Sequence, residues 1–239
     1  MSKRAIILAG GKGTRLKPYT VVLPKPLMPI GDFPILEVII RQLAFYGFDH
    51  VTLTVSHQAD IIKAYFGDGS KWNIKIDYSL EEKPLSTMGP LSLINDLPDN
   101  FLVMNGDILT DLNFSELYEY HVANKNTFTV SSYVREQVNL YGVLDVDASG
   151  KLFGFREKPI TTFEVSMGIY MLSKNVMSYI KYNETYGFDT LMLDMIKSGK
   201  PANVKKFNGY WLDIGRPDDY MQAIDEFEQK QSIFLPKNK

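Results

Sequence analysis

The feature that most restricts the fold of this chain is a short apolar segment that runs directly into a glycine-rich loop. Residues 5–8 read Ala-Ile-Ile-Leu, and the loop that follows contains Gly10, Gly11 and Gly13. An apolar run of this length that stops at glycine is typical of a buried parallel strand. Glycines in the loop let backbone N–H groups approach a ligand closely, as polyphosphate binding requires. The sequence therefore predicts a strand that ends in a phosphate loop.

Two familiar phosphate loops do not match this segment. A Walker A motif ends in Gly-Lys-Ser/Thr, whereas Lys12 precedes Gly13 here, and the third glycine of a dinucleotide fingerprint would fall on Leu16. The local charge still favours an anionic ligand, because residues 1–31 contain lysines and arginines but neither Asp nor Glu. Among these cations, Arg15 can contact a phosphate through two hydrogen bonds.

Apolar periodicity along the rest of the chain alternates between strand and helix patterns. Expected strands lie at residues 51–55, 74–79, 101–104, 128–134, 165–172 and 210–214, and expected helices at residues 35–45, 59–66, 91–97, 113–124, 173–179, 190–198 and 217–228. A hairpin is expected where residues 142–146 and 152–155 flank the turn sequence Asp-Ala-Ser-Gly. Strands separated by helices imply right-handed crossovers. The pattern therefore predicts an α/β fold, with a Rossmann-like, mainly parallel sheet flanked by helices and a small antiparallel subregion.

No repeat or flexible linker divides the chain. We therefore expect a single domain over residues 1–230, followed by a C-terminal tail at residues 231–239 that looks loose.

Composition limits the cellular setting and the classes of partner. The 239-residue chain contains no cysteine, which excludes a disulfide framework and agrees with a reducing cytoplasm. Its apolar runs are shorter than the roughly 20 residues that a bilayer crossing needs. A formal net charge of −2 is unlike that of a dedicated nucleic-acid binder. We therefore expect a cytoplasmic protein that acts on neither membranes nor nucleic acids.

A second motif makes the phosphate-loop prediction more specific. Lys25 lies between Pro24 and Pro26, and a lysine on so stiff a backbone can be aimed at a phosphate with a low ordering cost. The run of residues 8–26 resembles the signature of the sugar-1-phosphate nucleotidylyltransferases, in which a glycine-rich loop is followed by Thr-Arg-Leu, Pro, Thr and Pro-Lys-Pro. The resemblance implies the nucleotide-diphospho-sugar transferase fold. It also implies transfer of a nucleoside monophosphate from an NTP to a sugar-1-phosphate, with release of pyrophosphate.

Two aspartates at the ends of expected strands are candidate metal ligands. Asp107 follows the apolar run of residues 101–104, and Asp213 ends the run Tyr-Trp-Leu. Open α/β sheets bind ligands at the carboxyl ends of their strands, and Mg²⁺ typically takes one or two carboxylates together with substrate phosphates. In the family that the chain resembles, the matching aspartates hold the catalytic metal. The resemblance thus implies Mg²⁺ at Asp107 and Asp213, with Arg15, Lys25 and Asp107 as the catalytic residues.

The segment at residues 79–91 corresponds to the family's base-reading loop. The Glu81 carboxylate can accept hydrogen bonds from N1 and the exocyclic amine of guanine, a donor pair that neutral pyrimidines do not match. GTP is therefore the favoured NTP, and the segment is most similar to that of mannose-1-phosphate guanylyltransferases. The chain departs from that group at Ser86-Thr87-Met88, where Gly-Thr-Ala is usual. The implied nucleotide-binding residues are Leu8, Gly10, Gly11, Gly13, Thr14, Arg15, Lys25, Glu81, Pro84, Ser86 and Thr87.

A third motif points to the second substrate. Glu157 and Lys158 match the family's Glu-Lys-Pro sequence, whose acid contacts sugar hydroxyls and whose lysine meets the sugar phosphate. Ser166 stands where the family commonly has asparagine. The sequence therefore does not decide whether the sugar is mannose, a heptose or an aminosugar. The implied sugar-phosphate-binding residues are Asn105, Gly106, Gly142, Glu157, Lys158, Ser166 and Gly168.

Other interpretations of the same residues stay open at this point. The base could be cytosine or uracil, which would make the chain a cytidylyl- or uridylyltransferase. A catalytically silent nucleotide-sugar sensor is the alternative from another class, although the joint presence of the cations and acids above argues against it. The sequence does not determine the oligomeric state, and a homodimer is one option.

Overall fold

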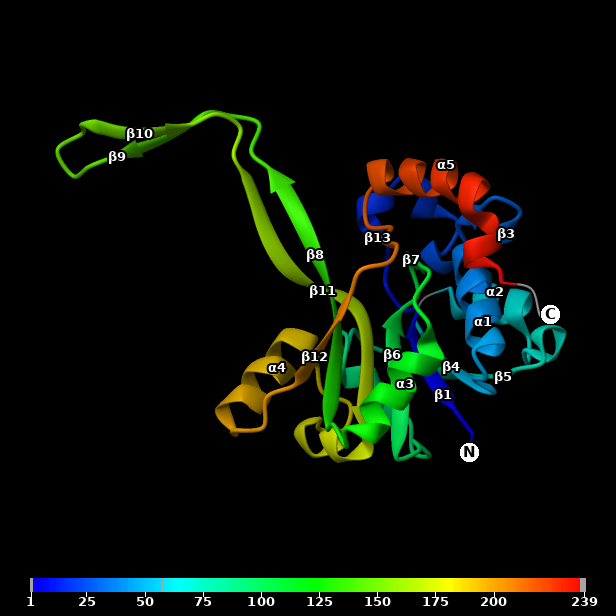
Figure 1. The fold of residues 1–239 in the computed structure, drawn as a ribbon. Helices are drawn as coiled ribbons and strands as arrows, with labels where there is room; N and C mark the ends of the chain where they lie inside the picture. Colours follow the sequence, from blue (N-terminus) through cyan, green and yellow to red (C-terminus); the bar gives the residue numbers. More distant parts are fainter. Residues whose placement is uncertain (1, 57, 237–239) are drawn as a thin grey trace.

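The computed structural model describes residues 2–56 and 58–236, and its centre is a seven-stranded sheet (Figure 1). The strand order is β12-β8-β11-β6-β1-β4-β5. These strands are β1 (Arg4–Leu8), β4 (His50–Val55), β5 (Lys75–Leu80), β6 (Asn100–Asn105), β8 (Phe128–Val138), β11 (Ile160–Ser173) and β12 (Asn203–Phe207). β11 pairs antiparallel with β6 and β8, and the other pairs are parallel. The predicted α/β fold with a mainly parallel sheet is confirmed.

Apolar residues cover both faces of this sheet, which explains why β1 reads as a continuous apolar run. Ile6 and Ile7 are both fully buried, but successive strand residues point to opposite faces, and the two belong to separate hydrophobic clusters. The larger cluster contains residues of α1 (Ile35–Phe45), α2 (Ala59–Phe66), α3 (Phe114–Ala123) and α5 (Pro217–Phe234). The smaller contains residues of α4 (Phe188–Lys197) and of the 3-10 helices Gly89–Leu93 and Lys174–Tyr179. The sheet is therefore a middle layer between helices.

Several elements differ from their expected form. The helices expected at residues 91–97 and 173–179 are 3-10 helices in the structure, and they span Gly89–Leu93 and Lys174–Tyr179. β12 was not predicted from the sequence, since it is a partly exposed edge strand with two lysines and no apolar run.

The helix α5 is longer than expected and packs on a segment near the beginning of the chain. It continues past residue 228 to Phe234, which is fully buried and stacks on Phe227 with ring centroids 5.8 Å apart. The expected loose tail is therefore wrong for residues 231–234, while residues 237–239 lie outside the described part. The Tyr220 hydroxyl of α5 donates to the Pro29 carbonyl over 2.7 Å. A Cβ at Gly31 would lie 2.9 Å from the Phe227 ring, so α5 packs directly on the segment after the phosphate loop.

Three small antiparallel sheets complete the described part of the fold, and one of them is the predicted hairpin. They pair β2 (Pro29–Ile30) with β3 (Phe33–Pro34), β7 (Ile108–Thr110) with β13 (Trp211–Asp213), and β9 (Val143–Val146) with β10 (Leu152–Arg156). The β9–β10 hairpin ends a long extension of β8 and β11 that projects from the body (Figure 1). We call residues 134–165 the arm. All of them are described, and none is buried.

Candidate nucleotide site

The glycine-rich loop follows β1 as predicted and lies at the end of an interior strand of the sheet, because β1 pairs with both β4 and β6. Gly13 adopts φ 60°, and a Cβ there would lie 3.0 Å from Thr20 Cγ2 and 3.2 Å from Lys25 Cβ. The Thr20 hydroxyl donates to the Gly13 carbonyl over 2.7 Å. Both the left-handed conformation and the close packing favour glycine at this position. The loop is thereby fixed against the segment that carries Lys25.

Lys25 lies at the start of a 3-10 helix, Lys25–Leu27, between its two prolines. Its ammonium group forms an ion pair with the Asp107 carboxylate, and both side chains are largely buried. The other carboxylate oxygen of Asp107, Oδ1, is buried without a hydrogen-bond partner in the described chain. A buried carboxylate oxygen without a partner is costly unless a ligand completes it. Lys25 and Asp107 thus meet across a large sequence separation, as expected of one site.

Asp213 approaches Asp107 through the small sheet of β7 and β13. Asp213 pairs in register with Ile108, and the Ile214 N–H donates to the Asp107 carbonyl over 3.0 Å. Burial raises the pKa of the Asp213 carboxyl above its ordinary value, and the nearby Asp107 charge adds to the rise, against opposing effects of Lys25 and Arg15. The two candidate metal ligands therefore share one electrostatic environment with Arg15 and Lys25.

The expected base-reading loop lies on the other side of the phosphate loop. Glu81 is positioned by the Leu85 N–H, which donates to Oε2 over 3.3 Å, and burial raises the pKa of this carboxyl. Thr87 Oγ1 accepts the Phe188 N–H over 2.7 Å. Ser86 adopts φ 64°, a conformation that favours glycine, which is the residue that the resemblance leads one to expect at this position.

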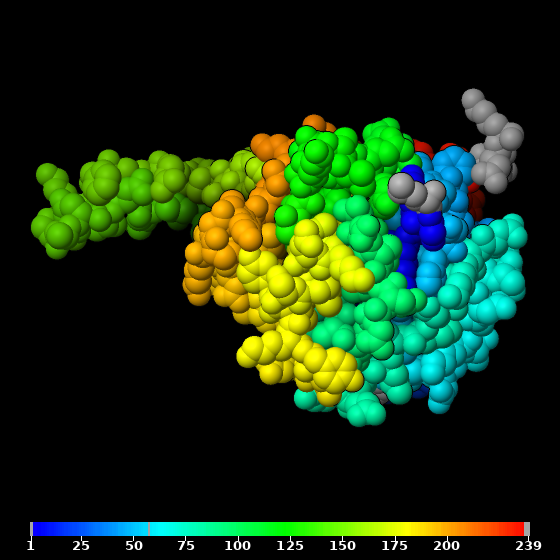
Figure 2. Space-filling view, turned by 90° about the horizontal axis from the view of Figure 1, so that it is seen from below, coloured from blue at the N-terminus to red at the C-terminus, as the bar shows by residue number. Residues whose placement is uncertain are grey.

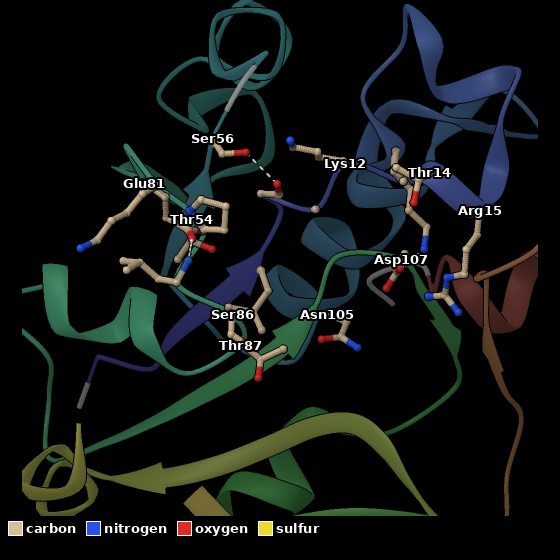
Figure 3. A pocket seen from close by; sticks show the side chains of 18 of the residues that line it. Lys12, Thr14, Arg15, Thr54, Ser56, Glu81, Ser86, Thr87, Asn105 and Asp107 are labelled. Carbon is tan, nitrogen blue, oxygen red and sulfur yellow. Dashed lines mark hydrogen bonds and ion pairs between the residues drawn. The ribbon is translucent and has the colours of Figure 1, made fainter. Parts of the chain in front are cut away.

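These segments surround one pocket of about 860 Å³. Figure 3 shows Thr14, Arg15 and Asp107 on one side of it and Glu81, Ser86 and Thr87 on the other. Every residue that the sequence predicted to bind nucleotide lines this pocket, and so do Asn105 and Asp107. The structure thus brings together cationic groups, backbone donors and carboxylates in a space large enough for a nucleotide.

The pocket also contains residues that sequence reasoning missed. They are Thr54, Ser56, Glu82, Lys83, Leu85 and Gly215. Thr54 stands beside Leu8 in the β1–β4 register, and the Ser56 hydroxyl donates to the Gly10 carbonyl over 2.7 Å (Figure 3). The signal for these two was available, because neighbouring parallel strands end at the same edge of a sheet.

Part of the expected sugar-phosphate set lies next to the pocket. Gly168 adopts φ 72°, and a Cβ there would lie 2.5 Å from Asn105 Nδ2, so the two residues are packed together. The Gly168 N–H donates to the Ser166 hydroxyl over 3.3 Å. The Gly106 N–H donates to the Leu8 carbonyl over 3.1 Å, which joins this group to the phosphate loop. Asn105, Gly106, Ser166 and Gly168 therefore form one continuous group beside the phosphate end of the pocket.

The remaining three expected residues lie elsewhere. Gly142, Glu157 and Lys158 are on the arm, and a Cβ at Gly142 would lie 3.3 Å from Glu157 Oε2. None of the three is among the residues that line the pocket, within the described chain. Their role in binding sugar phosphate stays a prediction.

Within residues 2–56 and 58–236, no group of three or more His, Asp or Glu side chains is placed to hold a metal ion by itself. None of the described helices combines the length and hydrophobicity that a membrane crossing demands.

Comparison with known proteins identifies the family. A family model described as nucleotidyl transferase matches residues 4–230. A UTP–glucose-1-phosphate uridylyltransferase of Synechocystis is 35% identical and matches 92% of this chain and 62% of its own length. A mannose-1-phosphate guanylyltransferase catalytic subunit beta of Xenopus tropicalis is 33% identical and matches 92% of this chain and 63% of its own length. A D-glycero-alpha-D-manno-heptose 1-phosphate guanylyltransferase of Campylobacter jejuni is 34% identical and matches 92% of this chain and 98% of its own length.

The chain thus spans less than two thirds of the first two relatives and nearly all of the third. Among solved structures, HddC from Yersinia pseudotuberculosis is 29% identical, with a TM-score of 0.72 over 94% of this chain and 99% of that chain. HddC has also been solved in complex with GMP-PN. The predicted resemblance is confirmed by these matches, and the chain belongs to the nucleotidyl transferase family.

Proposed function

We propose that this chain transfers a nucleoside monophosphate from an NTP to a sugar-1-phosphate and releases pyrophosphate. One observation carries the proposal: a single pocket combines the phosphate loop, Arg15 and Lys25 with Glu81 on one side and Asp107 on the other. A triphosphate needs backbone donors and cations, and a metal-bound triphosphate also needs carboxylates. The family to which the chain belongs supports the same chemistry.

GTP is the favoured nucleotide. Glu81 presents a partly buried carboxylate at the pocket, and its acceptors match the N1–H and amine donors of guanine. The guanylyltransferase names of the Campylobacter and Xenopus relatives point the same way, as does the GMP-PN complex of HddC. UTP is the second candidate, because the Synechocystis relative is a uridylyltransferase.

Mg²⁺ is the proposed metal, with Asp107 and Asp213 as its protein ligands. Both groups offer oxygen, Asp107 Oδ1 is buried without a partner in the described chain, and the Asp107 charge contributes to the raised pKa of Asp213. Two carboxylates with room for substrate phosphates suit Mg²⁺. Bound there, the ion would supply positive charge that offsets the repulsion between two anionic reactants.

The reaction is a direct displacement at the α-phosphorus. An oxygen of the sugar phosphate forms the new P–O bond while the bond to the β-phosphate oxygen breaks, and pyrophosphate leaves with that electron pair. Arg15 and Lys25 hold the triphosphate, and the phosphate loop supplies backbone donors. A phosphate nucleophile is already ionised at neutral pH, so the reaction requires no general base.

We propose that the second substrate binds next to Asn105, and the packing of Gly106, Ser166 and Gly168 around this residue supports the proposal. The C. jejuni relative, which this chain matches over nearly its whole length, acts on a heptose 1-phosphate according to its name. A manno-heptose-1-phosphate is therefore the first candidate, with mannose-1-phosphate second. The cytoplasmic location expected from the composition stays a prediction.

A pyrophosphate-release screen tests this proposal. The purified chain is incubated with Mg²⁺ and each of GTP, UTP, CTP and ATP against heptose-1-phosphate, mannose-1-phosphate and glucose-1-phosphate. We expect the fastest release with GTP and a manno-configured sugar. The proposal is wrong if no pair releases pyrophosphate while GTP still binds, because that result identifies a nucleotide sensor.

A further inference from the structure

The arm has the properties of a protein interface, and no residue of the described chain covers it. Its large apolar side chains are exposed: Val134, Val138, Leu140, Tyr141, Leu144, Val146, Leu152, Phe153, Phe155, Ile160 and Phe163. Tyr141 is 79% exposed and Phe153 is 74% exposed. Figure 2 shows the arm standing clear of the body. An isolated two-stranded ribbon is marginally stable in water, so a ribbon with this surface is suited to packing against another molecule.

The end of the arm has one face that is wholly apolar and one that carries an ion pair. In the β9–β10 register, Leu144 is opposite Phe155 and Val146 is opposite Leu152, and residues paired in this way share a face. The other face carries Asp145 and Arg156, which form an ion pair of 2.8 Å, together with Gly154 and the partly buried Val143. A ribbon with water on both sides would be expected to carry polar side chains on both faces. The apolar face of β9 and β10 therefore indicates a partner.

The same arm carries the sugar-phosphate motif. Glu157 and Lys158 follow β10, and neither forms an ion pair with any residue in the described part of the chain. Lys158 adopts φ 43°, which is uncommon for a residue with a side chain and tends to persist at functional positions. The motif is thus formed and exposed, while the pocket of its own chain is lined without it.

The stem of the arm fixes the direction in which the motif points. β8 and β11 pair without interruption from Val138–Ile160 to Ser132–Ser166, so a ladder of backbone hydrogen bonds holds the arm in its outward course. Folding the motif back onto the pocket of the same chain would require this ladder to bend or break. A second chain, in contrast, can receive the arm as it stands.

We propose that the arm docks on a second copy of this chain and places Glu157 and Lys158 at the sugar-phosphate end of that copy's pocket. Each copy carries Glu157 and Lys158 on its arm, while neither residue lines the pocket of its own described chain. In a two-fold symmetric dimer, each arm could supply these residues to the pocket of the other copy. The arm's roughly 30 residues agree with the 20–30 residues per side of a standard protein interface. This inference rests on the proposed function, since it assigns the origin of two residues of the same reaction site.

Paired inactive variants test the exchange of arms. Asp107→Ala removes the pocket function of a chain, and the double variant Glu157→Ala/Lys158→Ala removes the arm function. The two chains are co-expressed with different tags, and the mixed dimer is isolated through both. In the mixed dimer, the pocket of the Glu157→Ala/Lys158→Ala chain receives the arm of the Asp107→Ala chain. One of the two sites is then complete, so we expect about half of the wild-type rate per dimer. Activity no higher than that of either variant alone, or failure to isolate a mixed dimer, overturns the inference.

Sedimentation provides a test that does not depend on activity. Phe153→Ser removes an exposed apolar side chain from the arm, and Tyr182→Ser removes one of equal exposure, 74%, from the body. We expect the wild-type chain to be dimeric, Phe153→Ser to weaken the dimer at least tenfold, and Tyr182→Ser to leave it unchanged. A monomeric wild-type chain, or equal effects of both substitutions, overturns the inference. A wild-type dimer that releases no pyrophosphate contradicts the proposed function instead.

Discussion

The Glu81 carboxylate occupies the space that a side chain at Gly10 would need. A Cβ at Gly10 would lie 2.8 Å from Glu81 Oε1 and 3.6 Å from Ser56 Cβ. The phosphate loop and the base-reading loop are therefore fitted to each other, although they come from different parts of the chain. Changing either residue should disturb the other.

Replacing the Glu81 carboxylate should change the choice of base. Glu81→Gln keeps the shape of the side chain but replaces one acceptor oxygen with a donor, which opposes the N1–H and amine of guanine. Hydrogen bonds to charged groups contribute about 1.5–3 kcal/mol, so kcat/KM for GTP should fall by about 10- to 100-fold. The value for UTP should change little. Measuring both nucleotides with one sugar phosphate checks this, and equal losses for the two would remove Glu81 from base recognition.

A methyl group at Gly10 should displace Glu81 rather than unfold the chain, and the neighbouring glycine offers a matched control. The Cβ would meet Glu81 Oε1, the far end of a flexible side chain, which can move aside at little cost in stability. Gly10→Ala should therefore unfold close to the wild-type temperature, while its preference for GTP over UTP falls because the carboxylate is out of place. A Cβ at Gly11 meets nothing within 4 Å, so Gly11→Ala should keep the base preference. Thermal unfolding and kcat/KM with both nucleotides check this, and an unchanged GTP preference in Gly10→Ala would mean that the two loops are not fitted as described.

Lys25 should contribute to the transition state rather than to folding alone. Its ammonium contacts Asp107 at the phosphate end of the pocket, and removing one such electrostatic group typically lowers kcat by about 10²–10³. We expect Lys25→Ala to show a loss of this size in the pyrophosphate-release assay. Lys200→Ala, on an exposed lysine outside the pocket, should retain the wild-type rate. Near-normal turnover by a folded Lys25→Ala variant would contradict the assigned role.

Asp213 should have opposite effects on stability and on metal use. Because its pKa is raised in the folded chain, ionised Asp213 destabilises the fold relative to the unfolded state. This cost is absent below the ordinary pKa of the group and fully present above the raised one. Asp213→Asn should therefore stabilise the metal-free protein at pH 7 while weakening its response to Mg²⁺. Unfolding at pH 7 without metal checks the first expectation, and a less stable variant would contradict it.

The same shift predicts how metal use depends on pH in the wild-type chain. As the pH falls through the raised pKa, Asp213 gains a proton and ceases to attract a cation. The Mg²⁺ concentration that gives half of the maximal rate should therefore rise as the pH is lowered through this raised pKa. The Asp213→Asn variant should lack this rise. A pH-independent Mg²⁺ requirement in the wild type would remove Asp213 from the metal site.

The sequence predicted those parts of the molecule whose signals are local. β1 and its loop are an apolar run beside glycines, so burial and turn chemistry can be inferred from neighbouring residues. β12 was not predicted, because an exposed edge strand needs no apolar run. The helical position of Phe234 was not predicted either, although this residue follows Phe227 at a spacing that places both on one helix face.

Non-local geometry accounts for what the sequence could not predict at the site. Thr54 lines the pocket because β4 is paired with β1 in a register that places it beside Leu8, and Gly215 lines the pocket because β13 is paired with β7. The hairpin at residues 142–156 could be predicted from its turn, but its direction depends on the extended pairing of β8 with β11. A motif can therefore be identified correctly while its position relative to the pocket is not.

The packing of α5 on Pro29 and Gly31 has a consequence for how the molecule is made. A ribosome synthesises the phosphate loop early and α5 only after the rest of the described sheet, and chains of this size begin to fold during synthesis. Until α5 has left the exit tunnel, the segment beside Lys25 lacks its support. A nascent chain should therefore acquire the ability to hold a nucleotide only at this late stage.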